Sequence, residues 1–187
     1  FSGGLLAMLL MSVYRLLSIN FDKRFLWSTG NNLFFGIFLY TIFIFLLLYG
    51  YILNEKSFKN LTKIFKHSGK LVSDYYLLYE NAAYINMGIL GIASTTYILL
   101  IGGDLNGPTI SGILTIVGFG TFGKHLFNVA PIMIGASLTV FLHIWELNSP
   151  SMLLAILFST ALAPIAGQYG WLLGMLTGFL HVAVVMN

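Results

Sequence analysis

The sequence contains no cysteine and very little charge. The lack of cysteine excludes disulfides, thiolate catalysis, iron–sulfur ligation and cysteine-based zinc sites. Charged residues make up 8% of the 187 residues, whereas an ordinary soluble domain carries roughly a quarter. With 58% hydrophobic residues and a mean hydropathy of +0.89, the chain cannot cover a water-facing surface. The composition therefore predicts an all-α integral membrane protein.

Catalytic motifs are also missing. The six carboxylates are scattered over the connections, and the sequence contains no HExxH, GxSxG or phosphate-loop pattern. A net charge of +3 on so apolar a chain indicates membrane topology rather than nucleic-acid binding. We therefore assign no catalytic residue, no metal and no cofactor, and we expect no nucleic-acid partner.

Apolar runs suited to a bilayer recur along the whole chain. A helix needs about 20 residues to cross the hydrocarbon, so the length leaves room for six or seven crossings and for no soluble domain. Residues 107–123 contain five glycines and Pro108, so a re-entrant segment and a full crossing both stay open. Within a single polytopic domain over 1–187, we expect transmembrane or re-entrant helices over 1–19, 33–53, 82–101, 107–123, 127–145, 152–166 and 171–186.

A lysine-rich stretch interrupts this pattern between residues 54 and 81. Its lysines recur three and four residues apart, with apolar side chains on the opposite side of a helical wheel. This spacing predicts one basic amphipathic helix in the membrane interface, and the alternative is a solvated basic helix that anchors a loop. The residues expected at the membrane surface are Lys56, Lys59, Lys63, Lys66 and Lys70.

The distribution of basic residues predicts the orientation. Five lysines in 54–81 lie on one side of the membrane, whereas Arg15, Lys23 and Arg24 belong to the other. The positive-inside rule therefore favours a cytoplasmic lysine-rich loop. If 107–123 crosses fully, Lys124 joins the cytoplasmic side and the count becomes six against three; if it is re-entrant, the count is five against four.

The densest group of polar residues beside a span lies within 120–138. Lys124, His125 and Asn128 combine a cation, an imidazole and an amide with flexible glycine backbone, and Pro131 interrupts the following helix. Such a junction is suited to binding an anion or a polar solute. The alternative is that Lys124 and His125 mark a membrane–water boundary between two spans.

Three more positions are candidates for a binding site. Asp104 and Asn106 lie in a glycine-rich stretch that indicates a turn or, alternatively, a cation or proton site at the mouth of 107–123. His181 lies in the middle of the last apolar stretch, so we expect it to be buried among helices, either hydrogen-bonded to a carbonyl or along a polar path.

Three stretches resemble a known family. They are FSGGLLA at 1–7, GGDLNGPTISGILTIVGFGTFGKHLFNVAPIMIGASL at 102–138 and GFLHVAVVMN at 178–187. These stretches resemble the uncharacterised bacterial membrane proteins grouped as domain of unknown function fifteen seventy-six. The resemblance implies a bacterial cell membrane and a polytopic unit that recurs within one chain. We therefore expect one truncated repeat unit whose partner is the remainder of a longer chain. The resemblance implies no substrate and no catalytic residue.

Glycine-broken segments with sparse charges at their ends are typical of transporter binding sites. We therefore expect a transporter or channel-like protein, with the lipid bilayer and a small polar solute or ion as its partners. One alternative is a noncatalytic scaffold or complex subunit, in which the glycines serve close helix packing. Another is a membrane-embedded enzyme acting on a lipid-linked substrate, with catalytic groups from outside this sequence.

Overall fold

The computed structural model describes residues 31–70, 74–143 and 145–186. Within these ranges the regular structure is entirely helical, so the predicted all-α fold is confirmed. The span expected over 1–19 lies outside the described residues.

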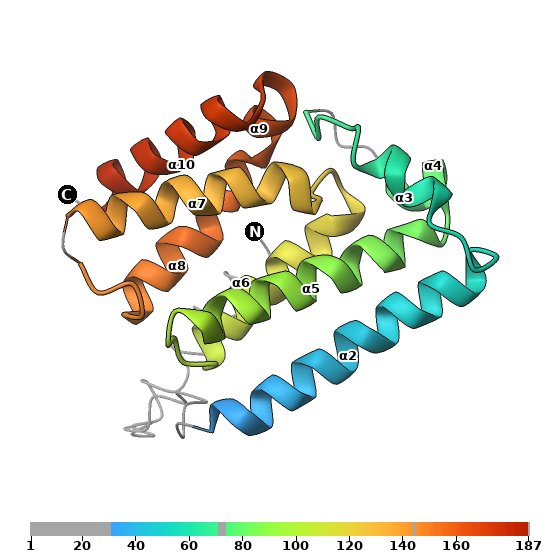
Figure 1. Cartoon of the computed structure of the whole chain (residues 1–187), viewed down its shortest axis with the longest axis horizontal. Coiled ribbons are helices and arrows are strands. Elements are labelled where there is room, and N and C mark those ends of the chain that lie inside the picture. Colours follow the sequence, from blue (N-terminus) through green and yellow to red (C-terminus); the bar gives the residue numbers. More distant parts are fainter. Residues whose placement is uncertain (1–30, 71–73, 144, 187) are drawn as a thin grey trace, which may run out of the picture.

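The helices follow one another with short connections (Figure 1). In chain order they are α2 (Asn32–Leu53), α3 (Lys59–Ile64), α4 (Tyr75–Tyr79), α5 (Ala82–Leu100), α6 (Gly107–Gly118), the 3-10 turn η1 (Phe119–Thr121), α7 (Leu126–Leu142), α8 (Pro150–Ser159), the 3-10 turn η2 (Thr160–Leu162), α9 (Ala163–Tyr169) and α10 (Trp171–Val185).

Three helical stretches of the described chain are long and apolar enough to cross a membrane. They are Asn32–Leu53, Ala82–Leu100 and Pro150–Tyr169, the last of which contains the turn η2. Shorter apolar helices cover Gly107–Thr121, Leu126–Leu142 and Trp171–Val185. Every apolar run predicted within the described residues is therefore helical, and most boundaries shift by only a few residues.

The helices α2 and α5 form an antiparallel pair. At one end, the side chain of Asn81 donates a hydrogen bond to the carbonyl of Leu53 (3.2 Å). At the other end, the side chain of Asn32 donates to the carbonyl of Gly103 (3.2 Å). We call the end that carries residues 54–81 the lysine end, and the end that carries residues 101–106 the distal end.

The next segments continue the alternation between the two ends (Figure 1). The stretch formed by α6 and η1 returns along α5 to the lysine end, where Asn86 of α5 donates to the carbonyl of Gly120 (2.7 Å). The helices α7 and α10 both run toward the distal end, and Thr139 of α7 donates to the carbonyl of Phe179 of α10 (2.8 Å). The stretch α8–η2–α9 runs the opposite way.

Glycine makes the close approach of α7 and α10 possible. A Cβ atom on Gly135 would lie 1.8 Å from the carbonyl oxygen of Met175, and one on Gly178 would lie 2.1 Å from that of Ile132. Small residues that let helix backbones touch are characteristic of packing inside membranes, where lipid gives helices no hydrophobic reason to associate.

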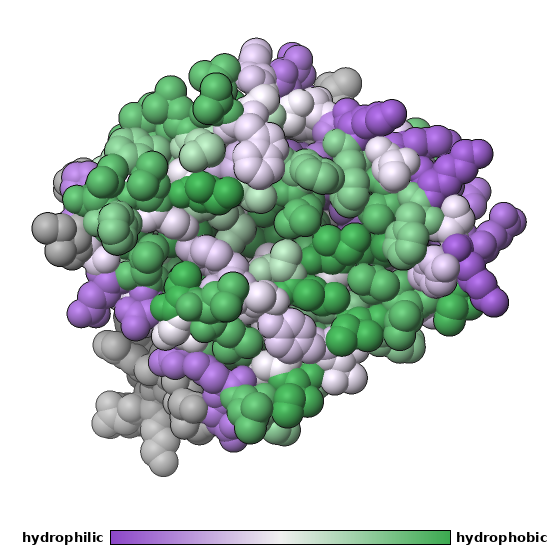
Figure 2. All heavy atoms as spheres, in the orientation of Figure 1, coloured by the Kyte–Doolittle hydropathy of each residue, from purple (hydrophilic) through white to green (hydrophobic). Residues whose placement is uncertain are grey.

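The surface carries an apolar band between two polar ends. On the face in Figure 2, hydrophobic side chains cover the middle of the molecule, and hydrophilic ones gather around α3 and α4 and at the distal end. The helix α2 illustrates the band, since Leu33, Phe45 and Ile52 are all exposed. This pattern is compatible with insertion into a membrane.

The segment 54–81 does not form the single continuous helix that the lysine spacing favours. Among its described residues α3 and α4 are helical, and the path between helices is broken where Glu55 and Lys56 have a φ of +55° and Gly69 has a φ of +72°. These left-handed conformations break the helical path. The five lysines named above are nevertheless all exposed, while Leu61 and Ile64 on the other side of α3 are buried.

Candidate functional site

Lys124 lies in the connection between η1 and α7, at the lysine end, and is only 7% exposed. Its Nζ atom donates a hydrogen bond to Oγ1 of Thr160 (2.8 Å) and lies 5.1 Å from the ring centroid of Phe119. The hydroxyl of Thr160 donates its own proton to the carbonyl of Leu157 (2.6 Å), so its oxygen is an acceptor for the lysine. This contact joins η1 to η2 across the interior.

The ammonium of Lys124 has no carboxylate beside it in the part of the chain that the structure describes. Burial lowers the pKa of Lys124 to about 8, because low-polarity surroundings disfavour the charged form. The group therefore remains protonated at neutral pH. An ammonium has three N–H donors, and among the described residues Thr160 is the hydrogen-bond acceptor for one of them, so this part of the chain leaves donors of a buried cation unused.

His125 follows in the chain and is 2% exposed. Its Nε2 atom lies 2.8 Å from the carbonyl oxygen of His67, and because a carbonyl can only accept, Nε2 carries the proton. Burial is the main cause that lowers the pKa of His125, so the ring is neutral at neutral pH. Its Nδ1 is then an acceptor, and among the described residues this buried atom has no hydrogen-bond partner.

Asn128 fixes the backbone around these two side chains. Its Oδ1 accepts a hydrogen bond from the backbone N–H of His125 (3.0 Å), and its Nδ2 donates to the carbonyl of Gly123 (2.8 Å). One amide thereby closes the turn that leads from η1 into α7. The residues that the sequence grouped together, Lys124, His125 and Asn128, are thus adjacent and buried.

The sequence analysis missed Asn86, which supports the same connection from α5. Its Nδ2 donates to the carbonyls of Gly120 (2.7 Å) and Lys124 (2.8 Å), while its buried Oδ1 has no partner among the described residues. The sequence did contain a signal for Asn86. Burying an amide side chain within an apolar span costs free energy, so such a residue is a candidate for a functional role. Thr160 was missed as well, since a threonine in an apolar run is too common to single out.

Residues 65–70 cover the junction from the lysine end, which the sequence did not indicate. A Cβ on Gly69 would lie 2.5 Å from the carbonyl oxygen of Gly123, and one on Gly167 of α9 would lie 2.2 Å from that of Ser68. Gly123 has a φ of +100°, a conformation that favours glycine. Backbone therefore packs directly on backbone here, beside the turn that carries Lys124.

Pro131 lies inside α7 and does not join the polar group. It is buried, and its Cβ would lie 3.2 Å from a Cβ on Gly174 of α10. Its contact with α10 makes it part of the packing between these helices.

Asp104 and Asn106 lie between α5 and α6 at the distal end, whereas Lys124 lies between η1 and α7 at the lysine end. Asn106 caps α6 through a reciprocal pair of hydrogen bonds with Thr109 (3.1 and 2.9 Å). The carboxylate of Asp104 accepts a hydrogen bond from Asn32 (3.2 Å), which ties the turn to the start of α2. Both residues therefore make the hydrogen bonds of a capped turn. The sequence left two interpretations open for them, a turn and a cation or proton site, and these hydrogen bonds are those of the turn.

His181 is half-buried on α10, not fully buried as the sequence suggested. It lines an open pocket of about 340 Å³ with Thr177 and Leu162, separate from the junction. No group of three or more histidine, aspartate or glutamate side chains within the described ranges could hold a metal ion.

Comparison with known proteins gives one result. A family described as protein of unknown function (DUF1576) matches residues 53–187, a range that includes every residue of the junction. No curated protein and no solved structure matches the chain.

Proposed function

This chain belongs to the DUF1576 family of proteins of unknown function, and from that premise we propose a membrane transporter or channel-like protein for a small anion. The observation that supports this most is the buried ammonium of Lys124, without a carboxylate beside it among the described residues. A buried charge is costly unless it is paired. An anionic solute would supply that pairing.

The surroundings of Lys124 favour a small ligand with negative charge. The positive end of α7 begins two residues later, and the partial charge of a helix N-terminus adds to that of the ammonium. His125 Nδ1 and Asn86 Oδ1 have no hydrogen-bond partner in the described part of the chain, and such acceptors favour a solute that also carries a proton or arrives with water. A singly charged oxyanion or carboxylate with its hydration shell meets both requirements.

We propose that the described helices cross the bilayer six times. The 22 residues of α2 span about 33 Å at 1.5 Å per residue, enough for the hydrocarbon core. The hydrogen bond between Asn86 and Gly120 supports a full crossing of residues 107–123, since it holds η1 at the lysine end. Every lysine among the described residues then lies at the lysine end, which the positive-inside rule assigns to the cytoplasm of a bacterial cell.

A scaffold or complex subunit is the second candidate. The backbone contacts of Gly135 and Gly178 between α7 and α10 support it, because small residues also serve helix packing without any transport. Solute flux distinguishes the two functions.

The test is anion entry into liposomes that contain the full chain. Vesicles made permeable to potassium with valinomycin are mixed with potassium salts of chloride, nitrate, formate, acetate or phosphate, and swelling is followed by stopped-flow light scattering. Urea and glycerol serve as neutral probes. We expect at least one anion to enter faster than into protein-free vesicles.

Three variants assign that flux to the junction. Lys124→Met is expected to return the rate to that of protein-free vesicles, and Lys124→Arg is expected to retain part of it because the charge remains. Lys63→Met removes an exposed lysine from α3 and is expected to change nothing. If no anion enters faster, or if Lys124→Met conducts like the unmodified chain, the proposal is wrong.

A further inference from the structure

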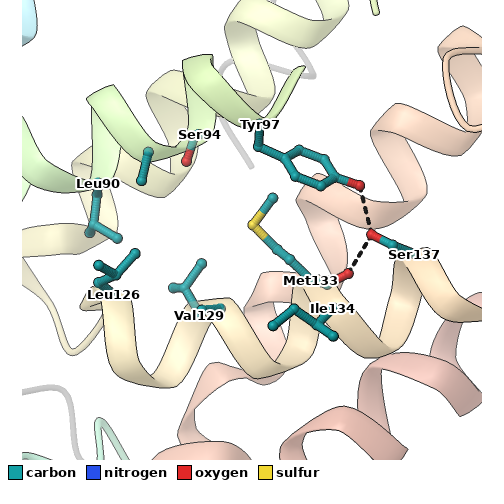
Figure 3. Close-up of a pocket in the computed structure, with 10 residues that line it drawn as sticks. Leu90, Ser94, Tyr97, Leu126, Val129, Met133, Ile134 and Ser137 are labelled. Carbon is teal, nitrogen blue, oxygen red and sulfur yellow. Dashed lines mark hydrogen bonds between the residues drawn. The ribbon is translucent and has the colours of Figure 1, made fainter. Parts of the chain in front are cut away.

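A partly open groove lies between α5 and α7 (Figure 3). Its volume is about 320 Å³, at the lower end of the roughly 300–1,000 Å³ typical of ligand pockets. We call it the α5–α7 groove; its walls include Leu90, Ala93 and Tyr97 from α5 and Leu126, Ala130 and Ser137 from α7.

The side chains that line the groove are mainly apolar. The hydroxyl of Ser137 donates to the carbonyl of Met133 (2.7 Å), so it accepts the proton of the Tyr97 hydroxyl at 2.7 Å (Figure 3). These two polar groups satisfy each other, Ser94 is the other polar side chain of the lining, and the rest of the wall is apolar. An occupant with several buried polar groups would find few partners for them. The chemistry therefore selects an alkyl chain.

The position of the groove indicates where such a chain comes from. The helix α5 is long and apolar enough to cross a membrane, and the groove follows it from Leu90 to Tyr97, about 10 Å at 1.5 Å per residue. The groove is partly open along its side. In the proposed arrangement that opening faces the hydrocarbon, so a lipid acyl chain can enter without crossing a polar surface.

Charge at one end of the groove identifies the lipid class. Leu126 lines the groove at the lysine end and follows directly after His125. Beside it, the ring of Phe127 packs edge-on against that of Phe65 (centroids 5.0 Å apart), and the exposed Lys66 follows Phe65. Figure 2 shows hydrophilic side chains gathered around α3 at this end. Exposed lysines at a membrane surface attract anionic headgroups.

We propose that the α5–α7 groove binds an anionic phospholipid, with one acyl chain between the helices and the phosphate beside Lys66 and Lys63. This site is distinct from the buried Lys124, which is not among the residues that line the groove. The lipid proposal requires only that the chain is inserted in a membrane. It is therefore independent of whether the protein conducts an anion.

Photocrosslinking in vesicles tests the proposal. The full chain is reconstituted in phosphatidylcholine with a trace of phosphatidylglycerol or phosphatidylcholine that carries a diazirine on its acyl chain. After illumination, mass spectrometry locates the modified residues. We expect the phosphatidylglycerol probe to label 90–97 and 126–137 several-fold more than the phosphatidylcholine probe does.

Matched variants distinguish binding of the lipid acyl chain from binding of the lipid headgroup. Ala93→Phe fills the groove and is expected to remove most of that labelling, whereas Leu114→Phe, on an exposed face of α6, is expected to retain it. Replacing Lys63 and Lys66 together by glutamine is expected to reduce labelling by phosphatidylglycerol to the level of phosphatidylcholine. Because both lysines are exposed, this variant tests the proposal even if Ala93→Phe does not fold.

Two results would overturn the proposal. Equal labelling by the two probes would show that the headgroup is not recognised. Labelling of other lipid-facing residues without labelling of the groove would show that protein, from this chain or a second copy, fills the space between α5 and α7.

Discussion

His125 and His67 are joined by a hydrogen bond from Nε2 to a backbone carbonyl, across 58 residues of sequence (2.8 Å). This bond selects the ring tautomer, and it also holds residues 65–70 over the junction. The ring of Phe65 lies against the same imidazole, with 5.8 Å between the centroids. The lysine-rich segment is therefore part of the candidate site as well as part of the surface.

Lys124→Met is expected to stabilise the protein while it removes flux. The substitution replaces a buried charge by an apolar side chain of similar length and so removes the cost of desolvating the ammonium, an effect of about 1–3 kcal/mol. For a chain of this size each kcal/mol corresponds to roughly 2–4 °C in the melting temperature. Thermal unfolding in detergent micelles, followed by tryptophan fluorescence, measures the difference.

The pH dependence of that difference provides a control. The pKa of Lys124 is lowered from 10.5 to about 8, so below pH 8 both folded and unfolded chains carry the charge. Between these two values the folded chain releases the proton first, and the unmodified protein gains stability relative to Lys124→Met. The difference in melting temperature should therefore shrink as the pH rises through this window. A variant less stable than the unmodified chain at neutral pH would contradict the expectation.

Asn86→Ala is expected to destabilise the fold by about 1–3 kcal/mol, because the buried carbonyls of Gly120 and Lys124 lose their donor. Thr115→Val is the comparison, since the Thr115 hydroxyl bonds only locally, to the carbonyl of Ser111 (2.8 Å). Melting temperatures in the same detergent report both effects. Equal effects of the two substitutions would mean that Asn86 does not hold the connection.

Gly135→Ala is expected to disrupt the pairing of α7 with α10, because its Cβ would meet the backbone of Met175. Gly118→Ala tests the same chemical change where, in the described part of the chain, no atom lies within 4 Å of the new Cβ. A sharp loss of monodisperse protein in size-exclusion chromatography is expected for the first substitution only. Similar profiles for the two variants would argue against the close approach of these helices.

Single cysteines test the orientation, and the natural absence of cysteine makes every label specific. Lys63→Cys lies at the lysine end and Glu146→Cys near the distal end, and both positions are exposed. In intact cells an impermeant maleimide is expected to label Glu146→Cys alone, while in inverted vesicles it should label Lys63→Cys alone. Labelling of Lys63→Cys from outside the cell would reverse the proposed topology.

The sequence predicts the long helices well because each depends on a local property. The run over 33–53 has no charge for 21 residues and reappears as α2, and 107–123 becomes α6 and η1 almost to the residue. The lysine spacing in 54–81 predicted one continuous helix, and the structure differs from it for a physical reason. Helical periodicity in 54–81 is overridden by the turn at Gly69, whose backbone packs on that of Gly123 far along the chain.

The candidate site was predictable only in part. Lys124, His125 and Asn128 are close in sequence, so composition alone could group them. The surroundings of the cluster depend on Thr160, which contacts Lys124, and on residues 65–70, which contact Gly123 and His125; both approach from distant parts of the chain. A basic residue at the end of a span therefore looks the same in sequence whether it faces water or the protein interior.

The backbone contacts of Ser68 with Gly167 and of Gly69 with Gly123 affect how fast this part of the protein can move. Side chains that block a passage can rotate aside within picoseconds to nanoseconds, whereas collective movements of backbone segments occur in microseconds to milliseconds. Backbone atoms make the close contacts of Ser68 with Gly167 and of Gly69 with Gly123, so a change of rotamer alone cannot separate these segments. If the proposed anion passes between residues 65–70 and the start of α7, its passage requires this backbone segment to move, and we then expect the slow turnover of a carrier rather than the fast flux of an open pore.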